Sequence, residues 1–231
     1  AAGWITVLAC LTRYEAWPIT AACFLASGFA WWRRGRGAGD LVPVYRRLAV
    51  YPALTVIGFM AFSRLTVGEW FVSGGFFVPD EALRGQPLAV AARITEGTVW
   101  LGGQWLVRGT LAGLAVLMAV GIGSPGRAPL LIGLSLFAAA ALPIFAYLAG
   151  HPFRMRYEIP LVVAGAFACG AALGLARRAA PILAPLVFAL VVWEVRPFDA
   201  NAPMVREAQL DQNVQPRAAV THRGGVSSAA S

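Results

Sequence analysis

The sequence predicts an all-α fold: a polytopic transmembrane helical bundle with about six spans and an N-terminal half-span remnant. Hydrophobic residues make up 58% of the 231 residues and charged residues 13%, too few charges to cover a soluble domain of this length. Several apolar runs approach or exceed the roughly 18 residues that indicate a membrane-spanning helix. The runs are continuously apolar, whereas the strands of a membrane β-barrel alternate apolar and polar residues over about 10 positions.

The apolar runs place the expected helices along the chain. The first run, Ala1–Leu11, would rise only about 16 Å as a helix, which is roughly half a bilayer. It has neither an initial Met nor the charged start of a signal peptide, so we expect this helix to begin upstream of residue 1. The other spans are expected at Trp17–Trp32, Leu48–Phe71, Val99–Ile122, Pro129–Leu148, Pro160–Ala176 and Pro181–Val195. Three of these spans open on proline, which the first helical turn tolerates.

Two polar segments fall outside these spans. The sequence PLAVAARITEG, from Pro87 to Gly97, is expected to form a short amphipathic helix at the membrane interface. After Val195 the chain becomes polar, and its end is rich in Ser, Ala and Gly. We therefore expect a transmembrane helical domain over residues 1–195, truncated at its N-terminus, and a polar, partly disordered extracytoplasmic tail over residues 196–231.

The distribution of arginine sets the expected orientation. The chain has a net charge of +8, and all 19 basic residues are arginine. The densest cluster, RRGRGAGDLVPVYRR, is expected on the cytoplasmic side, because arginines in short loops favour that side. Alternation then places SPGRAP and ARRAAP on the same side, and TRYEAWP and AGHPFRMRYEIP outside. Because the arginines lie in loops on both sides, no nucleic acid is expected as a partner.

The tripeptide Arg-Tyr-Glu occurs twice, in TRYEAWPI and in MRYEIPLV, each time at the expected outer edge of a span with a proline behind it. Residues two apart do not face each other on a helix, so Arg and Glu of one copy are not expected to pair. Each residue could instead pair with the other copy, Arg13 with Glu158 or Arg156 with Glu15. The alternative is that both motifs only anchor helix ends, with arginine at lipid headgroups.

The second copy belongs to HPFRMRYE, which gathers five polar or ionisable side chains in eight residues. Arginine forms bidentate hydrogen bonds with phosphate, and histidine exchanges protons near neutral pH. The cluster therefore suits the phosphate or pyrophosphate of a lipid-linked substrate, and a solvated hairpin is the alternative. The candidate substrate- and phosphate-binding residues are Arg13, Tyr14, Glu15, His151, Arg154, Arg156, Tyr157 and Glu158.

The sequence identifies no metal ligand and no certain cofactor. It leaves open whether the protein uses a divalent metal. Asp80 and Glu81 are adjacent carboxylates of a kind that binds divalent metals, but PDEA is also typical of acids in the first turn of a helix. Cys10, Cys23 and Cys169 show no metal-binding spacing. The sequence contains no glycine-rich phosphate loop, HExxH or GxSxG motif.

The sequence LACLTRYEAWPITAACFLASGFAWWRR resembles a recurring element of the C-type polytopic membrane glycosyltransferases, which include protein mannosyltransferases and aminoarabinose transferases. In that family a short helix ends in a Leu-Thr-Arg-Tyr-Glu-like motif, before a span and a basic cytoplasmic loop. HPFRMRYEIPLV is similar to the family's late external loop. PFDANAPMVREAQ is similar to a region that follows the last span in some bacterial members.

The resemblance implies a glycosyltransferase of the bacterial cytoplasmic membrane, with its active face extracytoplasmic. Such an enzyme transfers a sugar from a polyprenyl-phosphate carrier to an acceptor. The implied partners are the polyprenyl-phosphate-linked sugar donor and the lipid bilayer, with Arg13, Arg154 and Arg156 near the carrier phosphate. Family members carry their catalytic acidic residue in the first external loop, so the resemblance implies a catalytic residue upstream of residue 1. A membrane transporter, a lipid flippase and a non-catalytic membrane scaffold are the alternatives.

Overall fold

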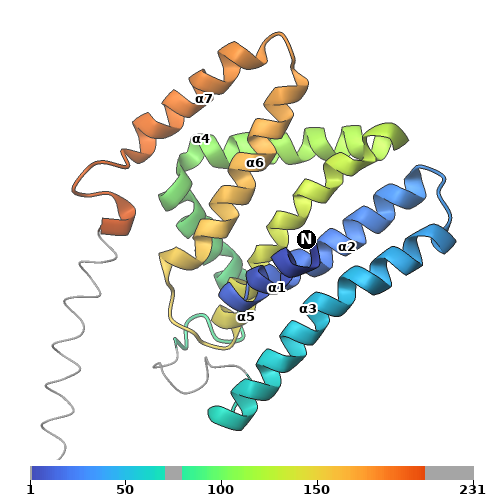
Figure 1. The fold of residues 1–231 in the computed structure, drawn as a ribbon. Coiled ribbons are helices and arrows are strands. Elements are labelled where there is room, and N and C mark those ends of the chain that lie inside the picture. Colours follow the sequence, from blue (N-terminus) through green and yellow to red (C-terminus); the bar gives the residue numbers. More distant parts are fainter. Residues whose placement is uncertain (1, 71–79, 206–231) are drawn as a thin grey trace, which may run out of the picture.

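The computed structural model describes residues 2–70 and 80–205. Within these residues all regular elements are helical, as the sequence predicts, and no strand is present. Figure 1 shows the elements in chain order: α1 (Ala2–Thr12), α2 (Ala16–Arg33), α3 (Ala38–Thr66), α4 (Pro87–Gly123), the 3-10 helix η1 (Pro125–Ala140), α5 (Ala141–Leu148), the 3-10 turn η2 (Met155–Glu158), α6 (Ile159–Leu175) and α7 (Ala180–Val195).

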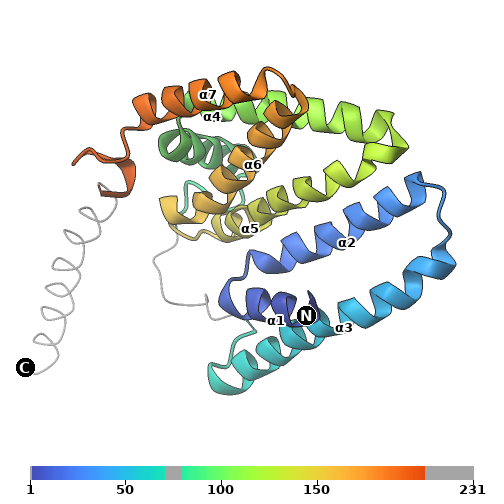
Figure 2. The same cartoon turned by 45° about the horizontal axis from the view of Figure 1, so that its top comes forward.

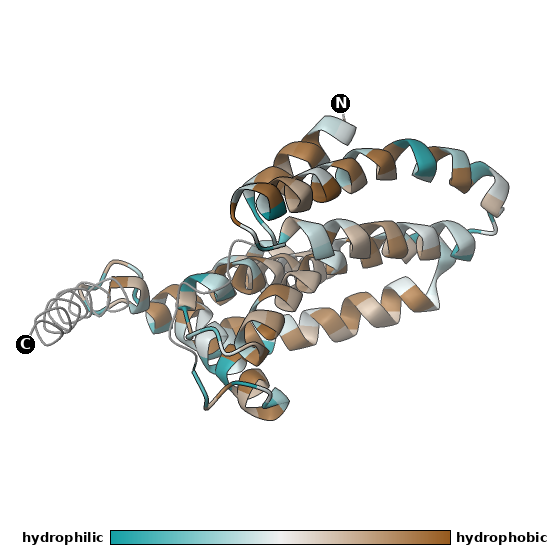
Figure 3. Cartoon of the chain, turned by 90° about the horizontal axis from the view of Figure 1, so that it is seen from below, coloured by the Kyte–Doolittle hydropathy of each residue, from teal (hydrophilic) through white to brown (hydrophobic). Residues whose placement is uncertain are grey.

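Four helical stretches of the described chain are long and apolar enough to cross a membrane: Ala38–Thr66, Pro87–Gly123, Pro125–Leu148 and Met155–Leu175. The helices α1 and α7 are apolar but shorter. Many large apolar side chains are exposed on the bundle, and Figure 3 shows brown, hydrophobic ribbon along most of its helices. By length and composition, these helices make the chain a candidate integral membrane protein.

Most predicted spans match the observed helices to within a few residues, but the prediction for α3 is wrong at both ends. The sequence predicts a span at Leu48–Phe71, whereas α3 begins at Ala38 and ends at Thr66. Residue Phe71 itself lies outside the described residues. The apolar run marks only part of the helix, because α3 continues through the exposed Arg46 and Arg47 at its start. Hydropathy therefore locates the apolar part of a helix and not its ends.

The element α4 consists of two helical halves joined at Gly103, whose φ of 76° and ψ of 162° are not helical. The first half contains Pro87–Gly97, which the sequence predicts as a separate interfacial helix. The second half contains most of the predicted span Val99–Ile122. The sequence thus predicts two helices here but places the boundary several residues too early, because it gives no weight to the glycine that breaks the helix.

The halves of α4 and the neighbouring helices pack closely where small residues meet. A Cβ atom at Gly113 of α4 would lie only 2.6 Å from the carbonyl oxygen of Ala168 in α6. Glycine therefore allows the two helix backbones to touch, as small residues do in membrane helix pairs. In the described part of the chain, η1 lies against α2, α4 and α6, while α1 packs on α3.

The connections between helices gather at two ends of the bundle. At one end, which we call the arginine end, lie the connections at residues 34–37, 124–127 and 176–179 (Figures 1 and 2). At the other end, which we call the motif end, lie the α1–α2 turn at residues 13–15 and the α5–η2 connection with η2, residues 149–158. The predicted alternation of loops groups these segments in the same way.

Candidate functional site at the motif end

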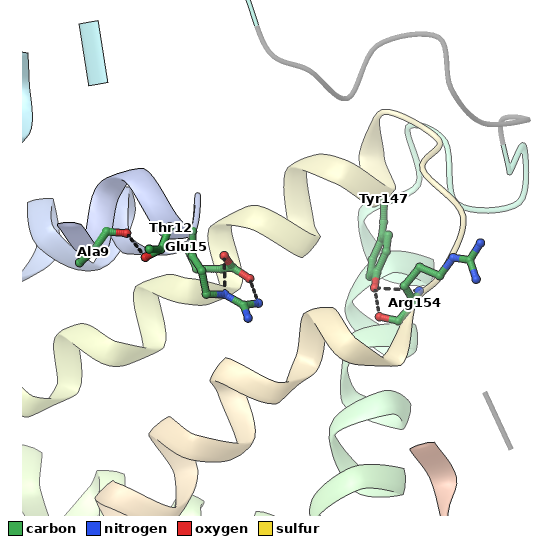
Figure 4. A network of polar contacts seen from close by, with 6 residues as sticks. Ala9, Thr12, Glu15, Tyr147 and Arg154 are labelled. Carbon is green, nitrogen blue, oxygen red and sulfur yellow. Dashed lines mark hydrogen bonds and ion pairs between the residues drawn. The ribbon is translucent and has the colours of Figure 1, made fainter. Parts of the chain in front are cut away.

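The first Arg-Tyr-Glu copy forms a bidentate ion pair with itself. The Nη2 atom of Arg13 lies 2.6 Å from Oε1 of Glu15, and its Nε lies 3.2 Å from Oε2 (Figure 4). The prediction that these residues do not pair is therefore wrong. The helical spacing rule does not apply, because α1 ends at Thr12 and α2 begins at Ala16, so the tripeptide is a turn.

Burial differs sharply within this ion pair. The Glu15 side chain is 7% exposed and the Arg13 side chain 57%, so the turn holds its carboxylate inside and its guanidinium at the surface. The hydrogen bond to Glu15 raises the pKa of Arg13 above its usual value, which keeps the guanidinium charged. The pair uses Nε and Nη2 of Arg13.

The tyrosine of the first copy packs in an aromatic cluster. The ring of Tyr14 makes edge-on contacts with Trp17 at 5.3 Å and with Phe59 of α3 at 5.5 Å between ring centroids. The indole Nε1 of Trp17 donates to the carbonyl oxygen of Cys10 at 2.8 Å, which satisfies a free carbonyl at the end of α1. These contacts fix the turn against α3.

The second copy places its glutamate fully inside the bundle. The hydroxyl of Tyr147, at the end of α5, lies 3.1 Å from Oε1 of Glu158. It also lies 3.2 Å from the carbonyl oxygen of Arg154 and accepts from the Arg154 backbone N–H at 3.4 Å (Figure 4). The predicted pairs between the two copies are wrong, because Glu158 faces Tyr147 and Glu15 binds Arg13.

One phenolic proton cannot satisfy every acceptor around Tyr147 at once. The hydroxyl can donate either to Glu158 or to the Arg154 carbonyl, and Oε2 of Glu158 is buried without a hydrogen-bond partner in the described residues. The buried carboxyl group is therefore incompletely satisfied. Such groups are uncommon in folded proteins and are retained at sites where they serve a purpose.

A glycine of α4 makes room for the buried carboxyl group. A Cβ atom at Gly97 would lie 3.0 Å from Cγ of Glu158 and 2.8 Å from the ring of Phe153. On the other side, Tyr147 packs with Leu83 and Val90 in the core of the motif end. The sequence pattern does not single out Tyr147. The one feature that could point to it is its position near the end of the apolar run ALPIFAYL.

The remaining candidates of the second copy gather around the ring of Tyr157. The ring of His151 makes an edge-on contact with it at 5.6 Å, and Cζ of Arg156 lies 5.8 Å from its centroid. The Nδ1 atom of His151 lies 3.0 Å from the carbonyl oxygen of Pro152. Arg156 is exposed and Arg154 is half-buried, so both guanidinium groups belong to the surface of the motif end.

The carboxylates of Asp80 and Glu81 bind residues two and three positions further along the chain. Oδ1 of Asp80 accepts a hydrogen bond from the Ala82 N–H at 3.0 Å, and Glu81 forms an exposed ion pair with Arg84 at 3.4 Å. These contacts stabilise a turn that packs on the α5–η2 connection, because the backbone N–H of Asp80 donates to Gly150 at 2.8 Å. The described residues contain no group of three or more His, Cys, Asp or Glu side chains placed to hold a metal ion.

A second polar arrangement, which the sequence did not predict, lies at the break in α4. The carboxylate of Glu194, near the end of α7, accepts from the backbone N–H groups of Gln104 at 2.8 Å and Trp105 at 3.0 Å. It therefore caps the start of the second helical half from a different helix. A pocket of about 500 Å³ lies beside this cap, and its polar lining includes Gln104, Arg196, Asp199 and Asn201.

Comparisons of the chain with protein-family models, with curated proteins and with solved structures find no match. The geometry described above therefore carries the argument for function. Two features of it matter most: the two Arg-Tyr-Glu copies at one end of the bundle, and the interrupted helix α4.

Proposed function

We propose that this chain binds the phosphate of a polyprenyl-phosphate-linked sugar at the motif end and takes part in transfer of the sugar to an acceptor. One observation supports this most directly. Two copies of one tripeptide, far apart in the sequence, lie at the same end of the bundle, and each buries its glutamate while its arginine is exposed. This arrangement presents fixed cations at the level where a carrier lipid would hold its phosphate.

The proposal includes a membrane arrangement. We take α2 and α7 as spans in addition to the four long apolar stretches, which gives six, with the motif end extracytoplasmic in a bacterial cytoplasmic membrane. Arginines in short loops favour the cytoplasmic side, and the arginine end holds the densest cluster of them.

The proposed chemistry needs positive charge at the motif end. Transfer breaks the bond between the anomeric carbon and the carrier phosphate oxygen, and it forms a bond from that carbon to the acceptor oxygen. The electron pair of the broken bond stays on the phosphate, so fixed cations stabilise the charge that develops there. We assign this role to Arg154 and Arg156, with Arg13 beside them. No residue of this chain is assigned as the base that takes the acceptor's proton.

Buried groups hold the backbone of Arg154 and the side chain of Arg13 in position. The hydroxyl of Tyr147 contacts both the N–H and the carbonyl oxygen of Arg154, and Glu158 lies behind it. In the first copy, Glu15 holds Arg13 through two hydrogen bonds. Prepositioned charges lose less entropy when they bind a ligand, which favours binding of a phosphate.

The proposal is tested by substitution in the full-length protein. The double variant Arg154→Gln/Arg156→Gln is expected to lower the rate of sugar transfer by about 100-fold or more, as loss of charge-stabilising donors does in other acyl and group transfers. The matched control is Arg46→Gln/Arg47→Gln, which removes two exposed arginines from the start of α3. Transfer is measured with a polyprenyl-phosphate-linked sugar in membranes that contain equal amounts of each variant.

Two results would argue against the proposal. Unchanged transfer in Arg154→Gln/Arg156→Gln would remove the phosphate role of these arginines. A loss of protein level and membrane insertion in that variant, with normal levels in the control, would instead identify the arginines as anchors of the helix ends. The alternative that both Arg-Tyr-Glu motifs only anchor helix ends at the lipid headgroups would then be favoured.

A transporter or flippase is the second candidate function, and the break in α4 favours it. Discontinuous helices of transporters direct the N-terminus of a half-helix at an anionic group, and here the N–H groups of Gln104 and Trp105 bind the carboxylate of Glu194. Flux of a labelled lipid-linked sugar across proteoliposomes in the absence of an acceptor would support this candidate. A flux equal to that of protein-free liposomes would exclude it for that substrate.

A further inference from the structure

A pocket of about 410 Å³ lies at the arginine end of the bundle, away from both motif copies. Three arginines line it, and each comes from a different connection: Arg34 follows α2, Arg127 lies in the first turn of η1, and Arg177 follows α6. The rest of the lining includes the apolar residues Pro129, Leu130 and Leu175. The pocket therefore combines three cationic side chains with an apolar wall.

Among the described residues, the pocket holds this positive charge without an acidic side chain in its lining. The ion pairs in the described residues are formed by Arg13, Arg84 and Arg93, and none involves the three arginines of the pocket. Three like charges at one pocket repel each other, so an anion from outside the chain would relieve an unfavourable arrangement.

Hydrogen bonds hold the connections together around the pocket. Nη2 of Arg34 donates to the carbonyl oxygen of Gly126 at 3.1 Å, next to Arg127 in the sequence. The guanidinium of Arg33 donates to the carbonyl oxygen of Ile122 at the end of α4. These two contacts fix the end of α2 against the α4–η1 connection, so the charges of Arg34 and Arg127 are brought together by the fold itself.

The backbone at Arg177 is unusual. This residue has a φ of 46° and occupies the first position after the C-cap of α6, Ala176. Glycine is the usual residue there, because it adopts the left-handed conformation without steric cost. The chain accepts the unfavourable conformation and presents an arginine to the pocket instead. Residues held in unfavourable backbone conformations cluster at functional sites.

We propose that the pocket at the arginine end binds the phosphate group of an anionic phospholipid, with Arg34, Arg127 and Arg177 as its ligands. Guanidinium groups bind phosphate oxygens through paired hydrogen bonds, and basic pockets between membrane helices accept phospholipid headgroups. The apolar wall of Leu130, Leu175 and Pro129 fits the beginning of an acyl chain. A free phosphate is the other source of the same chemistry. The site is separate from the motif end and does not depend on the proposed function.

The test compares two triple variants of the full chain in lipid nanodiscs. Arg34→Gln/Arg127→Gln/Arg177→Gln removes the pocket charges. Arg36→Gln/Arg46→Gln/Arg47→Gln removes three arginines from the α2–α3 connection and the start of α3, which do not line the pocket. Binding of phosphatidylglycerol relative to phosphatidylcholine is measured by native mass spectrometry. A separate titration with inorganic phosphate, in a zwitterionic detergent, tests the free ion.

The pocket variant is expected to lose about tenfold or more of its preference for phosphatidylglycerol, because loss of a charge-assisted hydrogen bond weakens binding by roughly this factor. The control variant is expected to change less than about threefold, since exposed charges outside the pocket contribute only screened attraction. If inorganic phosphate binds and only the pocket variant loses it, the site is supported with free phosphate as the ligand. Equal losses in both triple variants, or no binding of either probe to the wild type, would overturn the proposal.

A smaller substitution keeps the test decisive if the triple variant is not monodisperse. The side chain of Arg127 is exposed and its backbone N–H donates to Ser124, a bond that glutamine keeps, so we expect Arg127→Gln to leave the fold unchanged. Its matched control is Arg47→Gln. A loss of phosphatidylglycerol preference in Arg127→Gln alone supports the pocket, and identical behaviour of the two single variants rejects it.

Discussion

Glu15 and Glu158 hold the same position in two copies of one tripeptide, and the structure buries both by different means. Glu15 is satisfied by a charged partner two residues away, which a turn allows and a helix would forbid. Glu158 receives only the neutral hydroxyl of Tyr147, and one of its oxygens has no partner in the described residues. The first arrangement is complete within the motif, and the second depends on a residue from another helix.

The substitution Tyr147→Phe tests this dependence. Loss of the hydroxyl removes the one side-chain hydrogen bond that Glu158 makes among the described residues, so we expect a loss of about 1–3 kcal/mol in the free energy of unfolding. Unfolding is followed by intrinsic fluorescence of the purified protein in detergent. The double variant Tyr147→Phe/Glu158→Leu removes both polar partners and is expected to recover most of the loss. No recovery in the double variant would show that the loss comes from the backbone of Arg154, which also loses its contacts with the hydroxyl, and not from Glu158.

At the scale of single residues, the sequence predicts which arginines lie at the surface of the motif end and misses the buried tyrosine behind them. Arg154 and Arg156 are at the surface of the motif end, where the sequence predicts them. Tyr147 is missed because one tyrosine at the end of an apolar run is also typical of the aromatic belt of any membrane helix. Its contact with Glu158 depends on the path of the α5–η2 connection, which no local pattern determines.

At the scale of elements, α4 shows how a helix can be broken and still be stable. Gly103 takes a backbone conformation that only glycine adopts readily, and the N–H groups beyond it would be unsatisfied without Glu194. The sequence predicts two helices here, because the amphipathic segment Pro87–Gly97 precedes the apolar run Val99–Ile122. It cannot predict the cap, since Glu194 belongs to a helix that lies 90 residues further along the chain.

The substitution Gly103→Ala is expected to destabilise the protein by about 1–3 kcal/mol, the range measured for strained backbone positions. The added Cβ atom would lie 2.6 Å from Oε2 of Glu194 and would require a positive φ at an alanine. Gly58→Ala in α3 is the matched control, because nothing lies within 4 Å of its Cβ position. That variant is expected to gain up to about 1 kcal/mol, since alanine favours the helix.

Thermal unfolding of the two variants in the same detergent gives the comparison. A destabilised Gly103→Ala with a neutral or stabilised Gly58→Ala supports the interrupted helix. Equal stability of both variants would mean that α4 runs through residue 103 without a break.

At the scale of the whole molecule, the helices separate two sets of connections with different chemistry. The motif end holds the two Arg-Tyr-Glu copies, and the arginine end holds a pocket whose three arginines form no ion pair with another described residue. The grouping of the connections follows from counting apolar runs, so the sequence predicts it. The pocket does not follow, because three separate connections give no sign in the sequence that Arg34, Arg127 and Arg177 line one pocket.

Cysteine labelling in intact cells tests the separation of the two ends. In a chain whose native cysteines are replaced by serine, Gly37→Cys marks the arginine end and Arg84→Cys marks the motif end. The turn that carries Arg84 belongs there because the backbone N–H groups of Asp80 and Gly85 donate to Gly150 and Leu148. We expect a membrane-impermeant maleimide to label Arg84→Cys from outside and Gly37→Cys only after permeabilisation. Labelling of both from one side would place the two ends on the same face of the membrane.

The cap at Gly103 also has a consequence for biosynthesis. Glu194 is made 90 residues after Gln104, and ribosomes add about 5–20 residues per second, so the second half of α4 exists for roughly 5–20 s before its cap. During this interval its first N–H groups are open to water, translocon or lipid headgroups. The bend in α4 therefore reaches its final form only when α7 has been synthesised, because Glu194 of α7 supplies its cap.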